Sequence, residues 1–148
     1  MTGKAGAAGE EPVSLGALDE LFQAALAMRA KAYAPYSRFP VGAALRSVEG
    51  GVFSGCNVEN AAYPLGSCAE ASAIAAMVAA GHRRIAECLV VGGTEEVVTP
   101  CGGCRQRLRE FAGPDVQVHC TTPSGARATY SVSALLPASF GPEHLERG

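Results

Sequence analysis

The chain has 148 residues, of which 48% are hydrophobic and 18% charged, and its formal net charge is −2. A chain of this length usually forms one domain, and this composition supplies a hydrophobic core, so a disordered or polyelectrolyte chain is excluded. No basic surface is indicated for a nucleic-acid backbone, and no apolar run reaches the roughly 18–20 residues of a membrane span. We therefore expect neither nucleic acid nor a membrane as a partner.

The beginning of the chain and the cysteines both bear on the compartment. Residues 1–12 are rich in Gly and Ala and lack the apolar centre of a secretory signal. A cytoplasmic location is therefore expected, in which thiols stay reduced. The cysteines are then expected to serve a metal or catalysis rather than three disulfides. There are six of them: Cys56, Cys68, Cys88, Cys101, Cys104 and Cys120.

We expect residues 1–13 to form a mobile tail and residues 14–148 a single domain. Ser14 is expected to cap a helix that continues to about residue 32, since apolar residues recur there every three or four positions. Residues 33–40 contain two prolines, which cannot continue that helix and predict a rigid aromatic loop.

Short strands and two more helices are predicted in the rest of the chain. The segment 69–80 is apolar on nearly every side, which predicts a central, buried helix. A further helix is expected to open at Thr99-Pro100 and to end at Gly113-Pro114. Strands are predicted at residues 41–48, 52–58, 87–92, 116–120 and 128–132. This order of elements indicates an α/β fold with a mixed sheet and helices on its faces.

Three of the cysteines lie where predicted helices begin. Cys68 precedes the buried helix, and Cys101 and Cys104 stand at the start of the next helix with a spacing that places both on one side of its first turn. The N–H groups of a helix N-terminus favour the thiolate, which is the form that binds zinc. Three thiolates with an open fourth position are typical of a catalytic zinc, whereas a structural site needs a fourth protein ligand.

Glu70 lies two residues after Cys68. Both side chains can face a metal only at the start of the helix, where Cys68 is half outside it, and Glu70 can then carry protons without being a ligand. A zinc-bound water ionises near neutral pH. Cys-x-Glu upstream of Pro-Cys-x-x-Cys fits the description of the zinc deaminases.

With these motifs the chain resembles the small homotetrameric cytidine deaminases of the cytidine/deoxycytidylate deaminase superfamily. The resemblance extends from about residue 33 to residue 145. It is carried by residues 36–45 (YSRFPVGAAL), 55–60 (GCNVEN), 63–70 (YPLGSCAE), 100–106 (PCGGCRQ) and 135–142 (LLPASFGP). It implies a three-layer α/β/α sandwich with a mixed five-stranded sheet.

The resemblance also implies an activity, which is the hydrolysis of cytidine and deoxycytidine to uridine and deoxyuridine with release of ammonia, in pyrimidine salvage. Cys68, Cys101 and Cys104 match the ligands of one zinc ion per subunit. Glu70 matches the proton-shuttling glutamate, and a zinc-bound hydroxide is expected to attack C4 of the base.

Further residues match substrate-binding positions of the family. Asn57 and Glu59 match a pair that binds the ribose 3′-hydroxyl, and Phe39 matches an aromatic residue beside the pyrimidine. Phe140 matches an aromatic residue contributed across a subunit interface, and Tyr63 lies in a substrate loop near a neighbouring subunit. Ala69 is also expected to bind substrate.

One position departs from the family. Many tetrameric members carry an arginine directly after the catalytic glutamate, where it binds the zinc-ligand sulfurs, and here that position is Ala71. Three thiolates on one Zn²⁺ leave a net charge of −1, which disfavours ionising a bound water. We expect helix N–H groups to compensate, with help from Arg105, while Arg107 and Arg109 lie on a solvated helix face.

Several alternatives remain open from the residues alone. Glu70 could serve as a partner of the helix dipole, Asn57 and Glu59 as the polar face of a strand, and Phe39 and Phe140 as packing residues. The whole protein could be a structural zinc module or a thiol–disulfide protein. It could also be a deaminase of a modified cytosine nucleoside, such as blasticidin S deaminase, or, least in keeping with the acidic chain, a polynucleotide editor.

Overall fold

A six-stranded mixed sheet forms the centre of the computed structural model, which describes residues 7–11 and 16–146. The order of strands across the sheet is β1-β6-β5-β4-β2-β3. The β4–β5 pair is parallel, and the other neighbouring pairs are antiparallel. The strands are β1 (Ala7–Glu11), β2 (Gly42–Ser47), β3 (Val52–Cys56), β4 (Ile85–Val91), β5 (Gln117–Thr121) and β6 (Arg127–Ser131).

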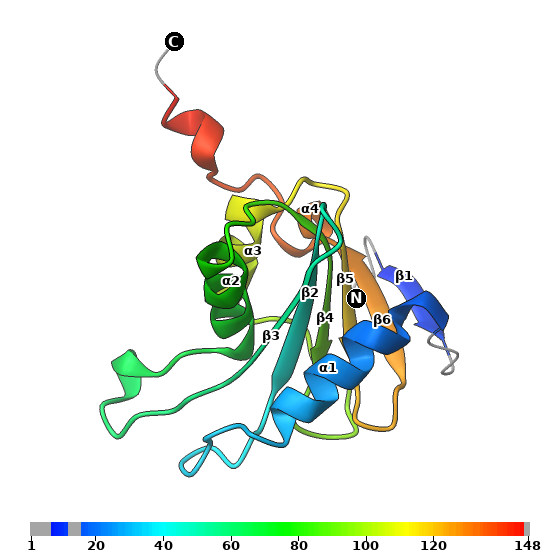
Figure 1. The fold of residues 1–148 in the computed structure, drawn as a ribbon, viewed down its shortest axis with the longest axis vertical. Helices are drawn as coiled ribbons and strands as arrows, with labels where there is room; N and C mark the ends of the chain where they lie inside the picture. The colour runs from blue at the N-terminus through cyan, green and yellow to red at the C-terminus, as the bar shows by residue number, and fades with distance from the viewer. Residues whose placement is uncertain (1–6, 12–15, 147–148) are drawn as a thin grey trace.

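Helices cover both faces of this sheet. Helix α1 lies across one face, and α2 and α3 lie side by side on the other (Figure 1), which confirms the expected three layers. The helices are α1 (Asp19–Arg29), α2 (Ala69–Ala79), α3 (Gly102–Phe111) and the short α4 (Val132–Leu135). Three short 3-10 helices accompany them: η1 (Gly16–Leu18), η2 (Tyr63–Leu65) and η3 (Pro142–His144).

The core lies on both sides of the sheet because successive strand residues face opposite ways. On β4, Cys88 and Val90 are buried in the cluster that contains α2 and α3, whereas Leu89 and Val91 are buried in the cluster that contains α1. A strand that is buried on both faces is apolar without alternation, as residues 88–91 are. Strand β4 therefore fixes the two helical layers relative to each other.

Two glycines let the helical layers approach the sheet closely. A Cβ atom on Gly42 of β2 would lie 1.8 Å from the carbonyl oxygen of Ala25 in α1. A Cβ atom on Gly55 of β3 would lie 2.5 Å from the backbone nitrogen of Ala73 in α2. Backbone therefore rests on backbone at both contacts, and any side chain at these positions would push a helix away from the sheet.

The structure differs from the sequence-based expectations at both ends of the chain. Strands β2–β6 are the five predicted ones, but residues 7–11, which we expected in a mobile tail, form β1 and extend the sheet antiparallel to β6. The segment Ala-Ala-Gly-Glu-Glu has none of the β-branched or aromatic residues that mark a strand, so nothing in its sequence indicated this. The predicted cap Ser14 lies outside the described residues, and so does the rest of the expected tail.

Helix α3 begins later than predicted. Cys101 is its N-cap and has an extended backbone, so Thr99 and Pro100 precede the helix rather than open it. The elements η2, α4 and η3 were not predicted, because three or four residues are too few to show a helical period.

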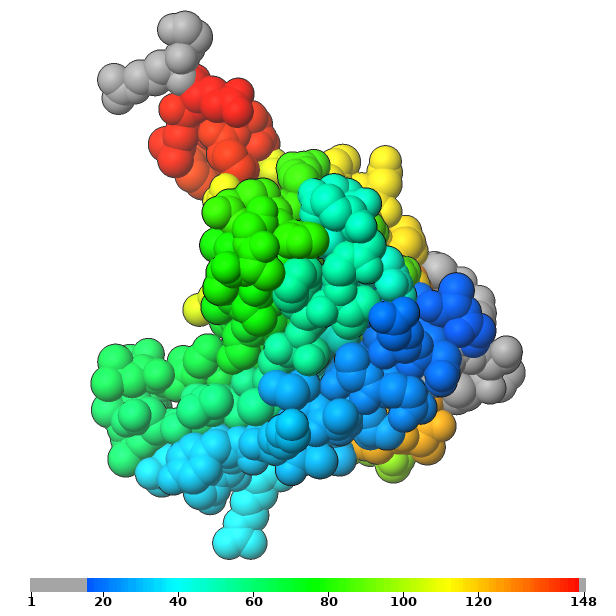
Figure 2. Space-filling model, in the orientation of Figure 1, coloured from blue at the N-terminus to red at the C-terminus, as the bar shows by residue number. Residues whose placement is uncertain are grey.

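Two segments stand away from the body of the molecule. One carries η2 and follows β3, and the other follows α4 and carries η3 near the C-terminus, seen as the red segment in Figures 1 and 2. Large apolar side chains are exposed on both, including Tyr63, Leu65 and Phe140. Over the described residues, every helix is too short or too polar to cross a bilayer.

Candidate metal centre and substrate cavity

The pairing of β2 brings two helix starts together at one edge of the sheet. Gly42, the first residue of β2, is paired with Cys56 at the end of β3 and with Val91 at the end of β4. The C-terminal ends of β3 and β4 therefore lie on either side of the same residue. Helix α2 follows β3 and helix α3 follows β4, so both helices begin near this edge, which is where ligand sites of α/β sheets usually form.

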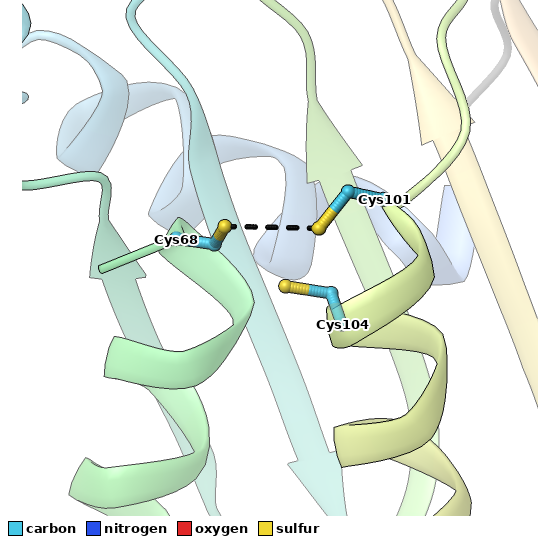
Figure 3. Close-up of side chains that lie close together, drawn as sticks. All are labelled: Cys68, Cys101 and Cys104. Atoms are coloured by element: carbon cyan, nitrogen blue, oxygen red, sulfur yellow. Dashed lines mark hydrogen bonds between the residues drawn. The ribbon is translucent and has the colours of Figure 1, made fainter. Parts of the chain in front are cut away.

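Three cysteine sulfurs meet at these helix starts. Cys68 is the N-cap of α2, Cys101 is the N-cap of α3, and Cys104 lies in the first turn of α3. Their Sγ atoms all lie within 4.8 Å of one another and point toward a common centre (Figure 3). The Sγ atoms of Cys68 and Cys101 are 3.8 Å apart, and all six cysteines of the chain are free.

This sulfur geometry fits a zinc ion. Tetrahedral zinc with Zn–S bonds near 2.3 Å holds its sulfur ligands about 3.8 Å apart, which is the separation of Cys68 and Cys101. Within the described part of the chain, no fourth His, Cys, Asp or Glu joins the group. Cys68, Cys101 and Cys104 could therefore hold one zinc ion and leave its fourth position open.

The pKa values of the thiols reflect their crowding. Burial raises the pKa of Cys104, and the neighbouring charges of Glu70, Cys68 and Cys101 raise it further. Burial also raises the pKa of Cys68. The pKa of Cys101 is lowered: its own burial acts in the opposite direction, but hydrogen bonds from the Cys104 backbone and from the thiols of Cys104 and Cys68 outweigh it. Sulfurs that repel one another as anions are stabilised together by a divalent cation.

Glu70 is a buried acid beside this cluster. It is the second residue of α2, and only 4% of its surface is exposed. Burial raises the pKa of its carboxyl group, although hydrogen bonds from its own backbone N–H and from Cys104 act in the opposite direction. A buried carboxyl group whose pKa is raised in this way can both accept and donate a proton.

A cavity of about 430 Å³ opens in front of the cluster and of Glu70. Most of the residues expected at the site from the sequence line it: Phe39, Asn57, Glu59, Cys68, Ala69, Glu70 and Cys101. The remaining lining residues were not singled out by the sequence analysis: Ser37, Val41, Val90, Val98, Thr99 and Pro100. Two signals could have indicated some of them: residues 98–100 directly precede Cys101, and Ser37, Val41 and Pro100 lie in segments that carry the family resemblance.

Asn57 and Glu59 hold the loop that precedes β2 against the cavity. The Asn57 side chain accepts a hydrogen bond from the backbone N–H of Val41 and donates one to the carbonyl oxygen of Phe39, both at 2.8 Å. The carboxylate of Glu59 accepts hydrogen bonds from the hydroxyl and backbone N–H of Ser37 and from the backbone N–H of Tyr36. These bonds lower the pKa of Glu59, the Ser37 hydroxyl most strongly, so this side chain is an anion at neutral pH.

Phe39 forms a wall of the cavity because a glycine stands behind its ring. A Cβ atom on Gly93 would lie 2.6 Å from the ring of Phe39. The glycine therefore allows the ring to rest directly on the backbone that follows β4. The ring is held in place from behind and presents its other side to the cavity.

Two of the expected substrate-binding residues, Tyr63 and Phe140, do not line this cavity. Tyr63 lines a neighbouring cavity of about 340 Å³ together with Tyr36, and 76% of Tyr63 is exposed. Phe140 is 58% exposed on the C-terminal segment and stacks on His144, with ring centroids 5.1 Å apart. Within the described chain, neither side chain meets the metal cluster.

The arginine nearest to the sulfurs is not the one expected. The guanidinium of Arg105 donates hydrogen bonds to the carbonyl oxygens of Pro100 and Leu135 and to the hydroxyl of Thr99. Arg107 instead reaches the cluster, because its Nη1 atom lies 3.7 Å from Sγ of Cys104. Position 107 follows Cys104 by three residues, so helical spacing alone could have indicated this contact.

A three-cysteine zinc site that opens on a cavity beside a buried carboxyl group places the protein among the zinc-dependent hydrolases. The sequence comparisons narrow this class. The family model described as the cytidine and deoxycytidylate deaminase zinc-binding region matches residues 17–120. The chain belongs to this family.

Individual relatives agree with this assignment. A cytidine deaminase of Sporosarcina psychrophila is 44% identical over 117 residues, which cover 79% of this chain and 86% of that protein. A cytidine deaminase of Halalkalibacterium halodurans is 41% identical over 125 residues, covering 84% and 95%. The crystal structure of the cytidine deaminase from Burkholderia pseudomallei superposes with a TM-score of 0.79 at 47% identity, covering 83% of this chain and 98% of that one.

Proposed function

We propose that this protein hydrolyses cytidine and deoxycytidine to uridine and deoxyuridine, with release of ammonia, as a step of pyrimidine salvage. The observation that carries the proposal is that Glu70 and the cysteines Cys68 and Cys101 line one cavity, in a chain that belongs to the deaminase family. A structural zinc module has no need of a buried carboxyl group beside its metal.

Cys68, Cys101 and Cys104 are proposed to hold the zinc ion. When bound, zinc supplies a Lewis acid that makes a water molecule nucleophilic near neutral pH. The protein's own contribution begins with the two helix starts, whose N–H groups stabilise the sulfur anions. Cys68 and Cys101 line the same cavity as Glu70, so a substrate in this cavity would lie beside both the metal site and the carboxyl group.

Glu70 is proposed to move the protons of the reaction. Its buried carboxyl group, whose raised pKa favours the protonated form, can give a proton to N3 of the cytosine ring. The carboxylate formed in this way can take one proton from the attacking water and pass it to the departing amine. It can then take the remaining proton from the C4 hydroxyl as the carbonyl group of uridine forms and ammonia leaves, which restores the acid. One side chain thus acts first as an acid and then as a base.

The rest of the cavity is proposed to position the nucleoside. The ring of Phe39 offers a flat apolar surface for the pyrimidine, and the small side chain of Ala69 leaves room above the start of α2. Asn57 and Glu59 are proposed to bind the ribose 3′-hydroxyl, since both line the same cavity and Glu59 is an anionic acceptor. Their hydrogen bonds to the loop also keep Phe39 in place.

We further propose that four copies of the chain assemble and that Phe140 and Tyr63 act near the site of a neighbouring copy. The support is the exposure of both rings on segments that stand away from the body. Large exposed apolar side chains of this kind commonly mark an interface. A cytoplasmic location is supported by the six free cysteines.

The loss of ultraviolet absorbance that accompanies conversion of cytidine to uridine tests the proposed function. Purified protein loaded with zinc is mixed with cytidine, beside the same protein stripped with a chelator and a third sample to which zinc is returned. We expect turnover in the first and third samples only. Zinc-loaded, folded protein that leaves both cytidine and deoxycytidine unchanged would contradict the proposal.

A further inference from the structure

One cationic side chain lies beside the sulfur cluster without being explained by the proposed reaction. Arg107 stands on α3, and its side chain runs back over the first turn of the helix, as helical side chains do. Its Nη1 atom lies 3.7 Å from Sγ of Cys104, the buried member of the cluster. Cys104 thus has a positively charged hydrogen-bond donor.

A glycine keeps this path open. A Cβ atom on Gly103 would lie 3.2 Å from Nη1 of Arg107, which is closer than ordinary van der Waals contact. Residue 103 lies between the two cysteines of α3, so a larger side chain there would crowd the guanidinium away from Cys104. Gly103 therefore leaves space for the guanidinium of Arg107.

The groove between α2 and α3 also leaves room for the guanidinium. Ala71 of α2 and Arg107 of α3 both line this groove. Because Ala71 has only a methyl group, the α2 side offers no charge, and the cation comes from the α3 side. Position 71 is thus a second place from which a long side chain could enter the same groove.

A cation beside the cluster can offset the negative charge that remains when zinc is bound. Cysteine binds zinc as a thiolate, so three ligands and one Zn²⁺ carry a net charge of −1 where three neutral thiols carried none. The guanidinium group of an arginine carries a positive charge, and hydrogen bonds from a charged donor are stronger than neutral ones. A guanidinium at this distance therefore favours the zinc-bound state over the metal-free state.

We propose that Arg107 is a positioning residue that offsets the negative charge of the three cysteine sulfurs and thereby raises the affinity of the site for zinc. The proposal rests on the function proposed above as far as it takes the metal to be zinc. Arg107 does not line the substrate cavity, so its effect on the nucleoside is indirect.

The test compares zinc affinity in four variants. Zinc dissociation constants are measured at pH 7.5 by competition with a chelator whose absorbance changes on binding zinc, and KM and kcat for cytidine are measured on the loaded proteins. The variants are Arg107→Gln, Arg107→Lys, the double variant Ala71→Arg with Arg107→Gln, and the control Arg83→Gln. Arg83 is an exposed arginine that bonds only backbone carbonyls among its recorded hydrogen bonds.

We expect Arg107→Gln to weaken zinc binding about threefold to tenfold, since the lost contact is a charge-assisted hydrogen bond at a partly solvated site. The KM for cytidine should stay within about twofold of the unchanged protein because Arg107 lies outside the cavity. Ala71→Arg in the Arg107→Gln background should recover much of the lost affinity, and Arg107→Lys should fall between the two. Arg83→Gln should match the unchanged protein.

Two results would overturn the proposal. One is an Arg107→Gln variant that binds zinc as tightly as the unchanged protein. The other is a loss of affinity that neither the lysine nor the Ala71→Arg variant restores, since that result would assign Arg107 a role in packing alone. Zinc affinity is measured without cytidine, so a protein that binds zinc but turns over no cytidine would refute the proposed function and leave this test intact.

Discussion

The Sγ atoms of Cys68 and Cys101 lie 3.8 Å apart, although 33 positions in the chain separate the two residues. They meet because β3 and β4 end on either side of Gly42 and because a helix starts beyond each of these ends. A metal bound between them joins α2 to α3. Zinc binding and the docking of these two helices on the sheet are therefore linked, and each stabilises the other.

The reactivity of Cys101 should report on the metal. Cys101 is exposed and its pKa is lowered, whereas Cys88 and Cys120 are fully buried and burial raises the pKa of Cys120 to about 12. We expect an alkylating agent to modify Cys101 quickly in chelator-treated protein and slowly in zinc-loaded protein, while Cys88 and Cys120 stay unmodified in both. Peptide mass spectrometry measures each site, and equal labelling of Cys101 with and without zinc would contradict zinc ligation.

Replacement of Glu70 by glutamine should separate metal binding from turnover. Glutamine keeps the shape of the side chain but cannot carry the proton, so we expect kcat to fall by about 10²–10⁴, the usual share of a general acid or base. Zinc content should stay at one ion per chain, because Glu70 is not part of the sulfur cluster. Glu110→Gln, an equal change of charge at an exposed position of α3, is the control. Cytidine turnover that survives the Glu70 change would refute the role of this residue.

The same substitution should stabilise the metal-free protein at neutral pH. Burial raises the pKa of Glu70 above its value of about 4.5 in the unfolded chain, so the folded state favours the protonated acid. The stability that this group contributes is present below pH 4.5 and is lost as the pH rises through the raised pKa. Glu70→Gln removes this loss. Thermal melting is measured in the presence of a chelator. The melting temperature of the variant should be a few degrees higher than that of the unchanged protein at pH 7.5, and the two melting temperatures should be nearly equal at pH 4. If the difference in melting temperature between the two proteins does not grow as the pH rises, ionisation of Glu70 does not destabilise the folded state.

Much of the metal site could be predicted because its signals are local. Cys101 and Cys104 are three residues apart on one helix turn, so their spacing places them on one side. Cys68 and Glu70 are two residues apart and can face the same metal because Cys68 is the N-cap of α2 and has an extended backbone. The meeting of the two pairs depends on the strand order, and the resemblance to a known family indicated it before the register of β2 was known. The structure places these four residues together.

Other features were not settled by local signals. Helical spacing places Arg107 within reach of Cys104, but it does not determine which arginine makes the contact. The choice between Arg105 and Arg107 depends on where each flexible side chain finds hydrogen-bond acceptors. Arg105 donates to the carbonyl oxygens of Pro100 and Leu135, whereas Arg107 donates to the sulfur of Cys104. Strand β1 pairs with β6 through backbone contacts, and a segment rich in Ala and Glu gives no sequence indication of a strand. Tyr63 and Phe140 lie outside the cavity of the single chain, and their proposed place near a substrate site rests on the proposed assembly of copies.

The contact between β3 and α2 should tolerate no added side chain at Gly55. A Cβ atom there would lie 2.5 Å from the backbone nitrogen of Ala73 and 2.6 Å from Cβ of Ser72. Because these are backbone and near-backbone atoms, α2 must shift as a whole, and we expect Gly55→Ala to lower the free energy of unfolding by about 1–3 kcal/mol. Zinc affinity should fall as well, since α2 carries Cys68. Gly113→Ala is the matched control, because its nearest atom would lie at an ordinary 3.9 Å. Urea unfolding that is the same for both variants would show that α2 adapts without cost.

Truncation of Phe140 should impair substrate binding without loss of zinc or of the fold. More than half of this ring is exposed, so Phe140→Ala leaves no core cavity, and the free energy of unfolding should change by no more than about 0.5 kcal/mol. If the ring reaches the site of a neighbouring copy, the loss of its contact with the base should raise KM about threefold to tenfold, as expected for one aromatic contact. Leu145→Ala, an equally apolar change at another exposed residue of the same segment, should leave KM unchanged. KM, zinc content and melting temperature are measured on both variants. An unchanged KM in Phe140→Ala would show that Phe140 does not belong to the substrate site, and a loss of zinc in that variant would assign Phe140 a structural role instead.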